Sequence, residues 1–245
     1  MRFLAMLSAD LLTKYGLQET EALEAIEVAI ARALTRALRK NLVVRINGRL
    51  EITAFSDKGE PVEILTKEIH RKLRRHIFHL VELELQKRQV LREAEVLQEL
   101  RGKNAPGEIS RISDNGTLHV VLEITDVFRH LIMTGECMFD QQPLHERGCY
   151  QKGEVREFFI SSIQPIVVNG RSANVRIRLS RINKELPALL LQERTGIYGI
   201  VCRRRISGVF SNIVTPARIP KEAINFVGKE LGEHLNVFIS QAYKK

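Results

Sequence analysis

The sequence predicts a multidomain α+β protein, in which a helical head, a small β-barrel and a short α/β unit follow one another. Apolar residues recur at helical spacing through most of the first hundred residues. After "GKNAPG" (102–107) the pattern changes to short strand-like segments, and after residue 183 helical and strand patterns alternate. We therefore predict three regions, 1–101, 105–182 and 183–245. A chain of 245 residues that is 44% hydrophobic has enough apolar side chains for more than one core.

The head is predicted to be a helix, a hairpin and a long helix. In "ETEALEAIEVAIARALTRALRK" apolar residues repeat at spacings of three and four, as in an amphipathic helix. In "LVVRINGRLEITAF" two alternating runs flank Asn47-Gly48, which is a strong hairpin signal. A helical pattern then runs from Thr66 to about Arg101, long enough to approach about 50 Å and to connect the head to the next region.

The middle region is predicted to be a barrel. Its five strand-like segments are "GEISRIS", "GTLHVVLEI", "RHLIMTGECMF", "GEVREFFISSI" and "ANVRIRLS", with turn residues between them. Five short strands over about 75 residues fit a small barrel of the OB type. The last region then reads as a helix, the hairpin "YGIVCRRRI" and "GVFSNIVT", the helix "IPKEAINFVGKELG" and the strand "EHLNVFIS".

The charge of the chain favours a polyanionic partner. The net charge is +9 and the pI is near 9.7. Residues 183–245 hold 10 Lys and Arg against 5 Asp and Glu, whereas residues 105–182 hold 9 against 9. The most basic region therefore includes the three consecutive arginines of "CRRRISGVF".

Several classes of protein are not indicated. The chain has no phosphate-binding loop, no GxSxG motif and no HExxH motif, so we expect neither an enzyme nor a cofactor. Three cysteines without a CxxC pair predict reduced thiols. His76 and His79 have helical spacing but no Cys or carboxylate at ligand spacing, so no metal site is expected. Without an apolar run of about 18 residues or a leader cleavage site, we expect a cytoplasmic protein with no membrane partner.

Two regions resemble known RNA-binding modules. "PGEISRIS", "YQKGEVREFFISSIQ" and "VRIRLSR" resemble the S1-type barrel, and "KELPALLLQERTGIYGIVCRRRISGVFSNIVT" with "INFVGKELGEHLNVFIS" resembles a bacterial, type II KH module. With the preceding head and long helix, this order resembles the NusA family of bacterial transcription elongation, termination and antitermination factors. The resemblance implies an S1-type OB barrel, a truncated KH-like unit, single-stranded RNA as the ligand, and contact of residues 1–101 with RNA polymerase.

The KH-like region departs from the usual pattern. KH modules clamp nucleotides with a GxxG loop, and "VTPARIPKEAI" contains no glycine. We predict that charged side chains replace this clamp and contact phosphates; they are Arg203, Arg204, Arg205, Arg218 and Lys221. In a regular strand Arg203 and Arg205 share one face and Arg204 lies on the other. The alternative is a solvated strand face in which an arginine pairs with a glutamate.

The barrel supplies a second set of RNA-binding candidates. OB-type domains stack bases on exposed aromatic rings beside basic side chains. The residues of these types are His119, Phe128, His130, Tyr150, Arg156, Phe158, Arg176 and Arg178. Core packing is the alternative for each aromatic residue, and of the adjacent Phe158 and Phe159 one is expected to face the core and the other to face outward.

The predicted function is RNA binding in the transcription machinery, acting on elongation, termination or antitermination. Two alternatives remain: a more general RNA-binding protein of the ribosome or of RNA processing, and a protein-interaction scaffold that has lost RNA binding.

Overall fold

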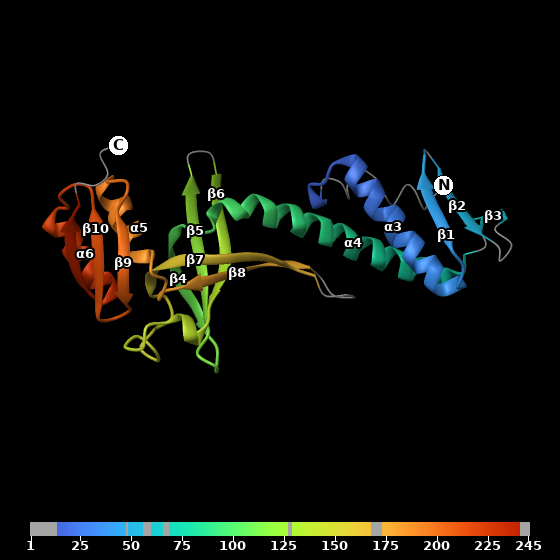
Figure 1. Cartoon of the computed structure of the whole chain (residues 1–245). Coiled ribbons are helices and arrows are strands. Elements are labelled where there is room, and N and C mark those ends of the chain that lie inside the picture. The colour runs from blue at the N-terminus through green and yellow to red at the C-terminus, as the bar shows by residue number, and fades with distance from the viewer. Residues whose placement is uncertain are drawn as a thin grey trace. The chain divides into compact units, whose positions relative to one another are not determined.

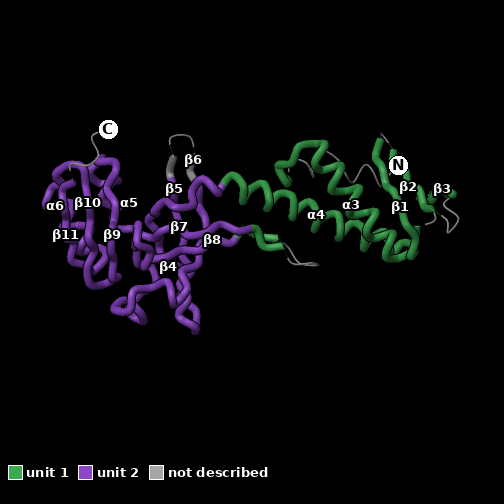
Figure 2. The backbone as a smooth tube through the Cα atoms, viewed as in Figure 1, with its two compact units in different colours: residues 1–96, 165–175 green, residues 97–164, 176–245 purple. Residues whose placement is uncertain are grey.

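The fold combines helices with several separate sheets, which confirms the mixed, multidomain architecture (Figure 1). The computed structural model describes residues 14–47, 49–55, 60–65, 69–126, 129–167 and 173–240, without the side chains of 125, 126, 129 and 130. It divides into two compact units, residues 1–96 with 165–175 and residues 97–164 with 176–245 (Figure 2). Within the described ranges, no helix is both long enough and apolar enough to cross a membrane.

The first unit contains the predicted helix, hairpin and long helix. Its elements are α3 (Glu19–Leu38), β1 (Leu42–Ile46), β2 (Leu50–Phe55), β3 (Pro61–Glu63) and α4 (Arg71–Leu97). Helix α3 begins with a capping box, because Gln18 and Glu21 bond each other's backbone N–H groups. The antiparallel β1–β2 hairpin is confirmed, while Gly48 of its turn and Thr66 lie outside the described residues. Strand β3 was not predicted, and α4 ends earlier than expected, in a short 3-10 turn (Gln98–Leu100).

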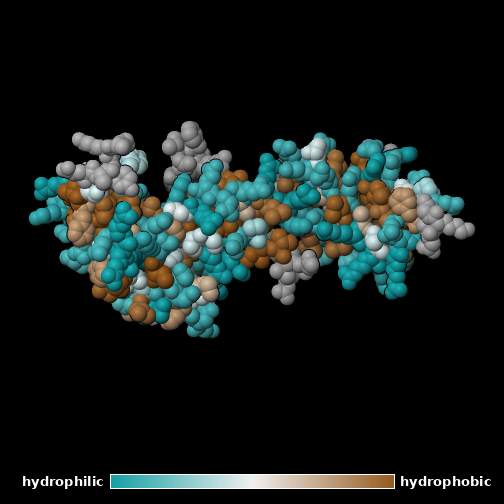
Figure 3. Space-filling view, viewed as in Figure 1, coloured by the Kyte–Doolittle hydropathy of each residue, from teal (hydrophilic) through white to brown (hydrophobic). Residues whose placement is uncertain are grey.

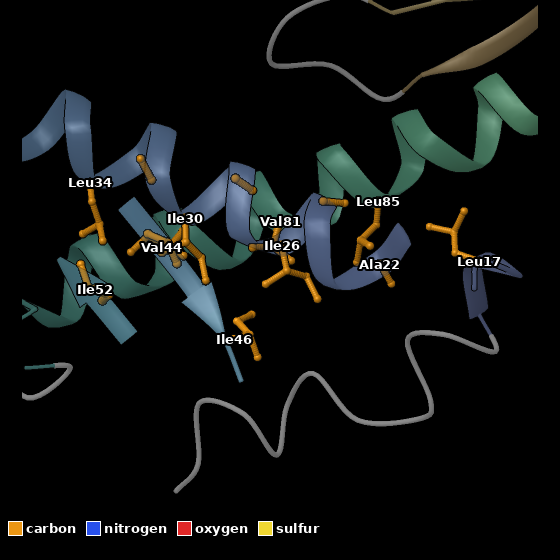
Figure 4. Packing of buried hydrophobic residues seen from close by; sticks show 14 of the residues in the cluster. Leu17, Ala22, Ile26, Ile30, Leu34, Val44, Ile46, Ile52, Val81 and Leu85 are labelled. Carbon is orange, nitrogen blue, oxygen red and sulfur yellow. The ribbon is translucent and has the colours of Figure 1, made fainter. Parts of the chain in front are cut away.

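The head has a hydrophobic core of its own. Buried side chains of α3, such as Ile26 and Ile30, join Val44 and Ile52 of the hairpin and Val81 of α4 in one cluster (Figure 4). Because α3 and α4 each present one apolar stripe and the hairpin presents alternate residues, the three elements bury their apolar faces against one another.

The middle of the second unit is a closed five-stranded barrel, as predicted. Its strands are β4 (Asn104–Ile112), β5 (Leu118–Asp126), β6 (Arg129–Cys137), β7 (Val155–Ile166) and β8 (Asn174–Ser180), in the order β4-β5-β6-β8-β7. Strands β6 and β8 are parallel, and β7 pairs with β4 to close the barrel. A Cβ atom at Gly107 would clash with Val120 and Leu122, so this glycine permits tight packing of the interior.

Both faces of the middle of β7 are covered, which corrects the prediction for Phe158 and Phe159. Phe158 is fully buried, while Phe159 is also buried but belongs to the core of the C-terminal elements. The expectation that one of the two rings faces outward was wrong because a second core lies against the outer side of this strand. Phe158 therefore offers no ring face to a base.

The last region has the predicted helix, hairpin, helix and strand. These are α5 (Leu186–Thr195), β9 (Val201–Ile206), β10 (Phe210–Thr215), α6 (Lys221–Leu231) and β11 (His234–Ile239). The central strand β10 is antiparallel to β9 and parallel to β11. Helices α5 and α6 bury apolar residues such as Leu191 and Val227 with Cys202, Ile213 and Leu235 of the sheet, so they cover one of its faces.

Candidate nucleic-acid interface

A row of polar side chains crosses the outer surface of the barrel. Strand register pairs Arg111 of β4 with His119 of β5, His119 with Glu136 of β6, and Glu136 with Arg178 of β8. Their neighbours in sequence, such as Leu118, Val120 and Leu179, are buried inside the barrel. Side chains alternate along a strand, so the row faces outward. We call Arg111, His119, Glu136 and Arg178, together with Arg176 of β8, the barrel row.

Short contacts connect the members of the barrel row. Arg111 Nη2 lies 3.0 Å from His119 Nε2, and Ser113 Oγ lies 2.8 Å from the same nitrogen. Because a guanidinium can only donate, the Arg111 contact requires His119 Nε2 to act as the acceptor. Glu136 Oε2 lies 3.4 Å from Arg178 Nη1 and 3.8 Å from Arg176 Nε. One carboxylate therefore serves two arginines, and the row retains an excess of positive charge.

The row brings together three of the residues predicted from the sequence, His119, Arg176 and Arg178. Sequence reasoning missed Arg111 and Glu136, because only the pairing of strands places them beside His119. The other candidate residues of the barrel either lie away from the barrel row or are not among the residues that the structure describes. Phe128 lies outside the described residues, and for His130 only the backbone, in β6, is described.

Tyr150 is corrected as a stacking residue. It is buried, and its hydroxyl forms a hydrogen bond with the Glu146 carboxylate. Burial raises the pKa of Tyr150, so the phenol remains protonated and can donate this hydrogen bond. Because its ring packs inside the protein, Tyr150 has no free face for a base.

Arg156 lies on β7 and belongs to a different cluster from the barrel row. Its Nε donates to Glu154 Oε1 at 2.7 Å, and its Nη1 lies 3.7 Å from Glu230 Oε2 on α6. Two carboxylates therefore surround this guanidinium. The arrangement gives Arg156 a role in contact between the barrel and α6, apart from the barrel row.

Arg181, which was not predicted, joins the barrel to the C-terminal elements. Its side chain is fully buried and all five N–H groups have acceptors. Nε and Nη2 bond the Glu146 carboxylate at 2.7 Å each, Nη1 bonds Glu157 O at 2.8 Å and Glu230 Oε1 at 3.0 Å, and Nη2 also bonds Glu230 O at 3.0 Å. Burial opposes the charge on Glu146, but the bonds and charge of Arg181 outweigh it and lower the pKa of this carboxyl.

The three consecutive arginines do not alternate as predicted. The register between β9 and β10 shifts next to Ile213, so that Cys202 pairs with Ile213 and Arg204 with Asn212, leaving Arg203 as the extra residue of a bulge. As a result Arg205 shares the helix-covered face with Cys202. Arg203 and Arg204 are exposed. The expectation that Arg203 and Arg205 share one face was therefore wrong.

Arg205 is an internal structural residue. Its side chain is 2% exposed and that of Glu233 is 0% exposed. Its Nη2 and Nε bond Glu233 Oε1 at 2.6 and 2.9 Å, and Nη1 donates to Asn183 O. Glu233 also accepts from Ser211 Oγ at 2.6 Å and from the Gly208 N–H at 3.1 Å. This is the glutamate pairing left open as an alternative, and it removes Arg205 from the RNA-binding candidates.

The remaining C-terminal candidates are exposed. Arg218 lies in the loop between β10 and α6, and Lys221 is the first residue of α6. Arg203, Arg218 and Lys221 form no ion pair with any residue in the described ranges. Arg204 lies over the ring of Phe210, with 5.6 Å between its Cζ and the ring centroid. These cations are available to a ligand.

The cysteines and the candidate metal-ligand residues bear on the predictions for thiols and metal binding. All three cysteines are free, as predicted, and burial raises the pKa of the Cys137 thiol to about 12. Within the described parts of the chain, no three His, Cys, Asp or Glu side chains are grouped to hold a metal ion. Comparisons with models of protein families and with curated proteins found no match to this chain.

Proposed function

We propose that this protein binds single-stranded RNA on the outer face of β5 and β6 and acts in the cytoplasmic transcription machinery, as the NusA factors do. The observation that carries the proposal is the register that aligns Arg111, His119 and Arg178 across adjacent strands. OB-type barrels bind oligonucleotides on the face of their second and third strands. Strands β5 and β6 are the second and third of this barrel.

The architecture and the charge support the same proposal. The barrel order β4-β5-β6-β8-β7 supports an OB-type, and specifically S1-type, barrel. The order helix, hairpin, helix and strand supports a truncated type II KH-like unit. Exposed Arg218 and Lys221 supply positive charge at the loop where a GxxG clamp is missing, and exposed Arg203 adds charge on β9. Such contacts bind phosphates with a strong salt dependence and little sequence preference.

The double variant Arg176→Ala/Arg178→Ala tests the barrel row. We expect its affinity for a fluorescent single-stranded oligoribonucleotide to fall about tenfold at low salt, with a salt slope smaller by about 1.4 because two phosphate contacts are lost. Fluorescence anisotropy at several salt concentrations measures both quantities. Arg49→Ala is the matched control, because Arg49 is an exposed arginine of the head. An unchanged affinity and slope in the double variant would remove the barrel row from the RNA site.

We further propose that the head contacts RNA polymerase. The head has its own core, and exposed apolar residues occur on both faces of its small sheet, Val43 on the face of Thr53 and Val62 on the face of Ala54. We expect Val43→Asp/Val62→Asp to abolish co-purification with RNA polymerase, because a buried charge weakens an apolar interface. Leu144→Asp, at an exposed apolar residue of the second unit, is the control. Co-purification with ribosomes in place of polymerase would favour the alternative role in ribosome function or RNA processing.

A further inference from the structure

One face of the C-terminal sheet is open. Helices α5 and α6 pack on the face that carries Cys202, Ile213 and Leu235. On the opposite face the register aligns Arg204, Asn212 and Asn236 in a central row across β9, β10 and β11. We call this second surface the open face. In the described structure no element covers it, and Phe238 is 57% exposed there.

The open face presents aromatic rings on both sides of a polar row. Phe210 lies towards one end of the face and Phe238, which pairs with Val214, towards the other. They are four residues and one strand apart, a separation of about 14 Å between their backbone positions. In the central row, Asn236 Nδ2 donates to Asn212 Oδ1 at 3.1 Å, and Arg204 stacks on the Phe210 ring. Figure 3 shows apolar side chains, in brown, at the surface of these C-terminal elements among hydrophilic ones.

The positive charge of the open face favours a polyanion as its ligand. Strands β9, β10 and β11 contain no acidic residue. Arg203 and Arg204 have no carboxylate partner among the described residues, whereas Arg205 on the covered face is paired with Glu233. A single nucleic-acid strand offers phosphates to the arginines, base faces to the aromatic rings and base edges to the asparagine amides.

We propose that the open face is a second RNA surface, on which Phe210 and Phe238 stack two bases of a single strand while Arg204, with Arg203 in the adjacent bulge, contacts its phosphates. The proposal rests on the RNA binding proposed above and adds a site on a different face of a different sheet. It assigns base stacking to the C-terminal unit and mainly phosphate contacts to the barrel row. Binding at the open face therefore depends on the bases, which gives a test that separates the two surfaces.

The test uses the full-length protein and two single-stranded RNAs of equal length, oligo(A) and an abasic oligoribonucleotide. Phe210→Ala and Phe238→Ala are each expected to weaken oligo(A) binding about tenfold, because each removes one stacking ring. Neither change is expected to alter the salt slope or the affinity for the abasic strand, because the phosphate contacts remain. Phe226→Ala is the matched control, since Phe226 on α6 is 51% exposed and also stacks with an arginine, Arg194.

The outcomes distinguish the two proposals. If Arg176→Ala/Arg178→Ala weakens binding but Phe210→Ala and Phe238→Ala do not, the open face is not an RNA surface while the barrel site stands. If the unchanged protein binds neither RNA, both proposals fail. Loss of a co-purifying protein on Phe238→Ala, with RNA affinity unchanged, would identify a protein surface and overturn the proposal. Thermal unfolding by circular dichroism checks the fold, and Phe238→Leu, which keeps bulk but no aromatic face, repeats the test if Phe238→Ala lowers Tm.

Discussion

The barrel and the C-terminal sheet place their arginine–glutamate pairs on different sides, exposed in the barrel and covered in the sheet. On the outer face of the barrel, Arg176 and Arg178 share Glu136. In the C-terminal sheet the carboxylate is on the covered face, where Glu233 holds Arg205, while the exposed Arg203 and Arg204 form no ion pair with any residue that the structure describes. Burial of the pair therefore separates the arginine that stabilises the fold from those that a ligand can reach, since the Arg205–Glu233 pair is almost fully buried and the pairs of Glu136 are partly exposed. A count of charges along the chain does not separate the two roles.

The largest expected effect is on the buried member of the arginine run. Arg205→Ala should lower the free energy of unfolding by about 3–5 kcal/mol, because it leaves Glu233 buried without its partner. Urea denaturation followed by circular dichroism measures the change. Arg203→Ala is the control on the same strand and should stay within about 0.5 kcal/mol, since its side chain is exposed. If Arg205→Ala and Arg203→Ala lowered the free energy of unfolding equally, Arg205 would not have the structural role assigned to it.

A pH titration tests the connection that holds the barrel to the C-terminal elements. The pKa of Glu146 lies below its ordinary value of 4.5, so its pair with Arg181 contributes fully above that value and is lost as the pH falls through the lowered pKa. We expect Glu146→Gln to lose about 1.5–3 kcal/mol of stability near pH 7 and to show a flatter decline in acid. Urea denaturation at several pH values measures both effects.

The pKa of Glu157 is shifted in the opposite direction from that of Glu146. Burial raises the pKa of Glu157, so its charged form opposes folding and its effect grows as the pH rises through the raised value. Glu157→Gln should therefore remove a loss of stability at higher pH. For Glu146, the contradicting result would be a free energy of unfolding that falls equally steeply in acid for Glu146→Gln and for the unchanged protein. It would refute the role assigned to the pair of Glu146 and Arg181.

The smallest expected effect is a gain in affinity on the barrel. Glu136→Gln removes the carboxylate shared by Arg176 and Arg178, so RNA binding at low salt should strengthen about two- to fivefold. Anisotropy with the same oligoribonucleotide measures the gain. Glu51→Gln, which frees Arg49 of the head, is the matched control and should leave affinity unchanged. Weaker binding by Glu136→Gln would mean that the carboxylate itself contributes to the site.

Local patterns predicted most of the elements. Strand-like segments between turn residues identified the five barrel strands, and helical and strand patterns identified the two hairpins, β11 and the helices α3, α4, α5 and α6. These predictions succeed because the period of side chains along a helix or a strand depends on neighbouring residues alone. The ends of elements were less accurate, as at α4, and the three-residue strand β3 was too short to give a pattern.

The roles of individual side chains were much harder to predict. A bulge at Arg203 reversed the expected face of Arg205, and a second core on the outer side of β7 buried Phe159 as well as Phe158. Arg181 gave no signal that distinguished it from Arg176 and Arg178, although it is the one of the three that is fully buried. Each of these outcomes depends on which strand or helix packs against the residue.

The amino-acid order by itself determined the succession of helices and strands, the excess of positive charge and the absence of a glycine clamp. Only the tertiary structure decided which cations are paired, because their partners are distant in sequence: Glu233 lies 28 residues from Arg205, and Glu230 lies 49 residues from Arg181. Strand register likewise assembled Arg111, His119, Glu136 and Arg178 into one row. Secondary structure depends on the local periodicity of the sequence. The grouping of side chains on a surface depends instead on contacts between residues that are far apart in the sequence.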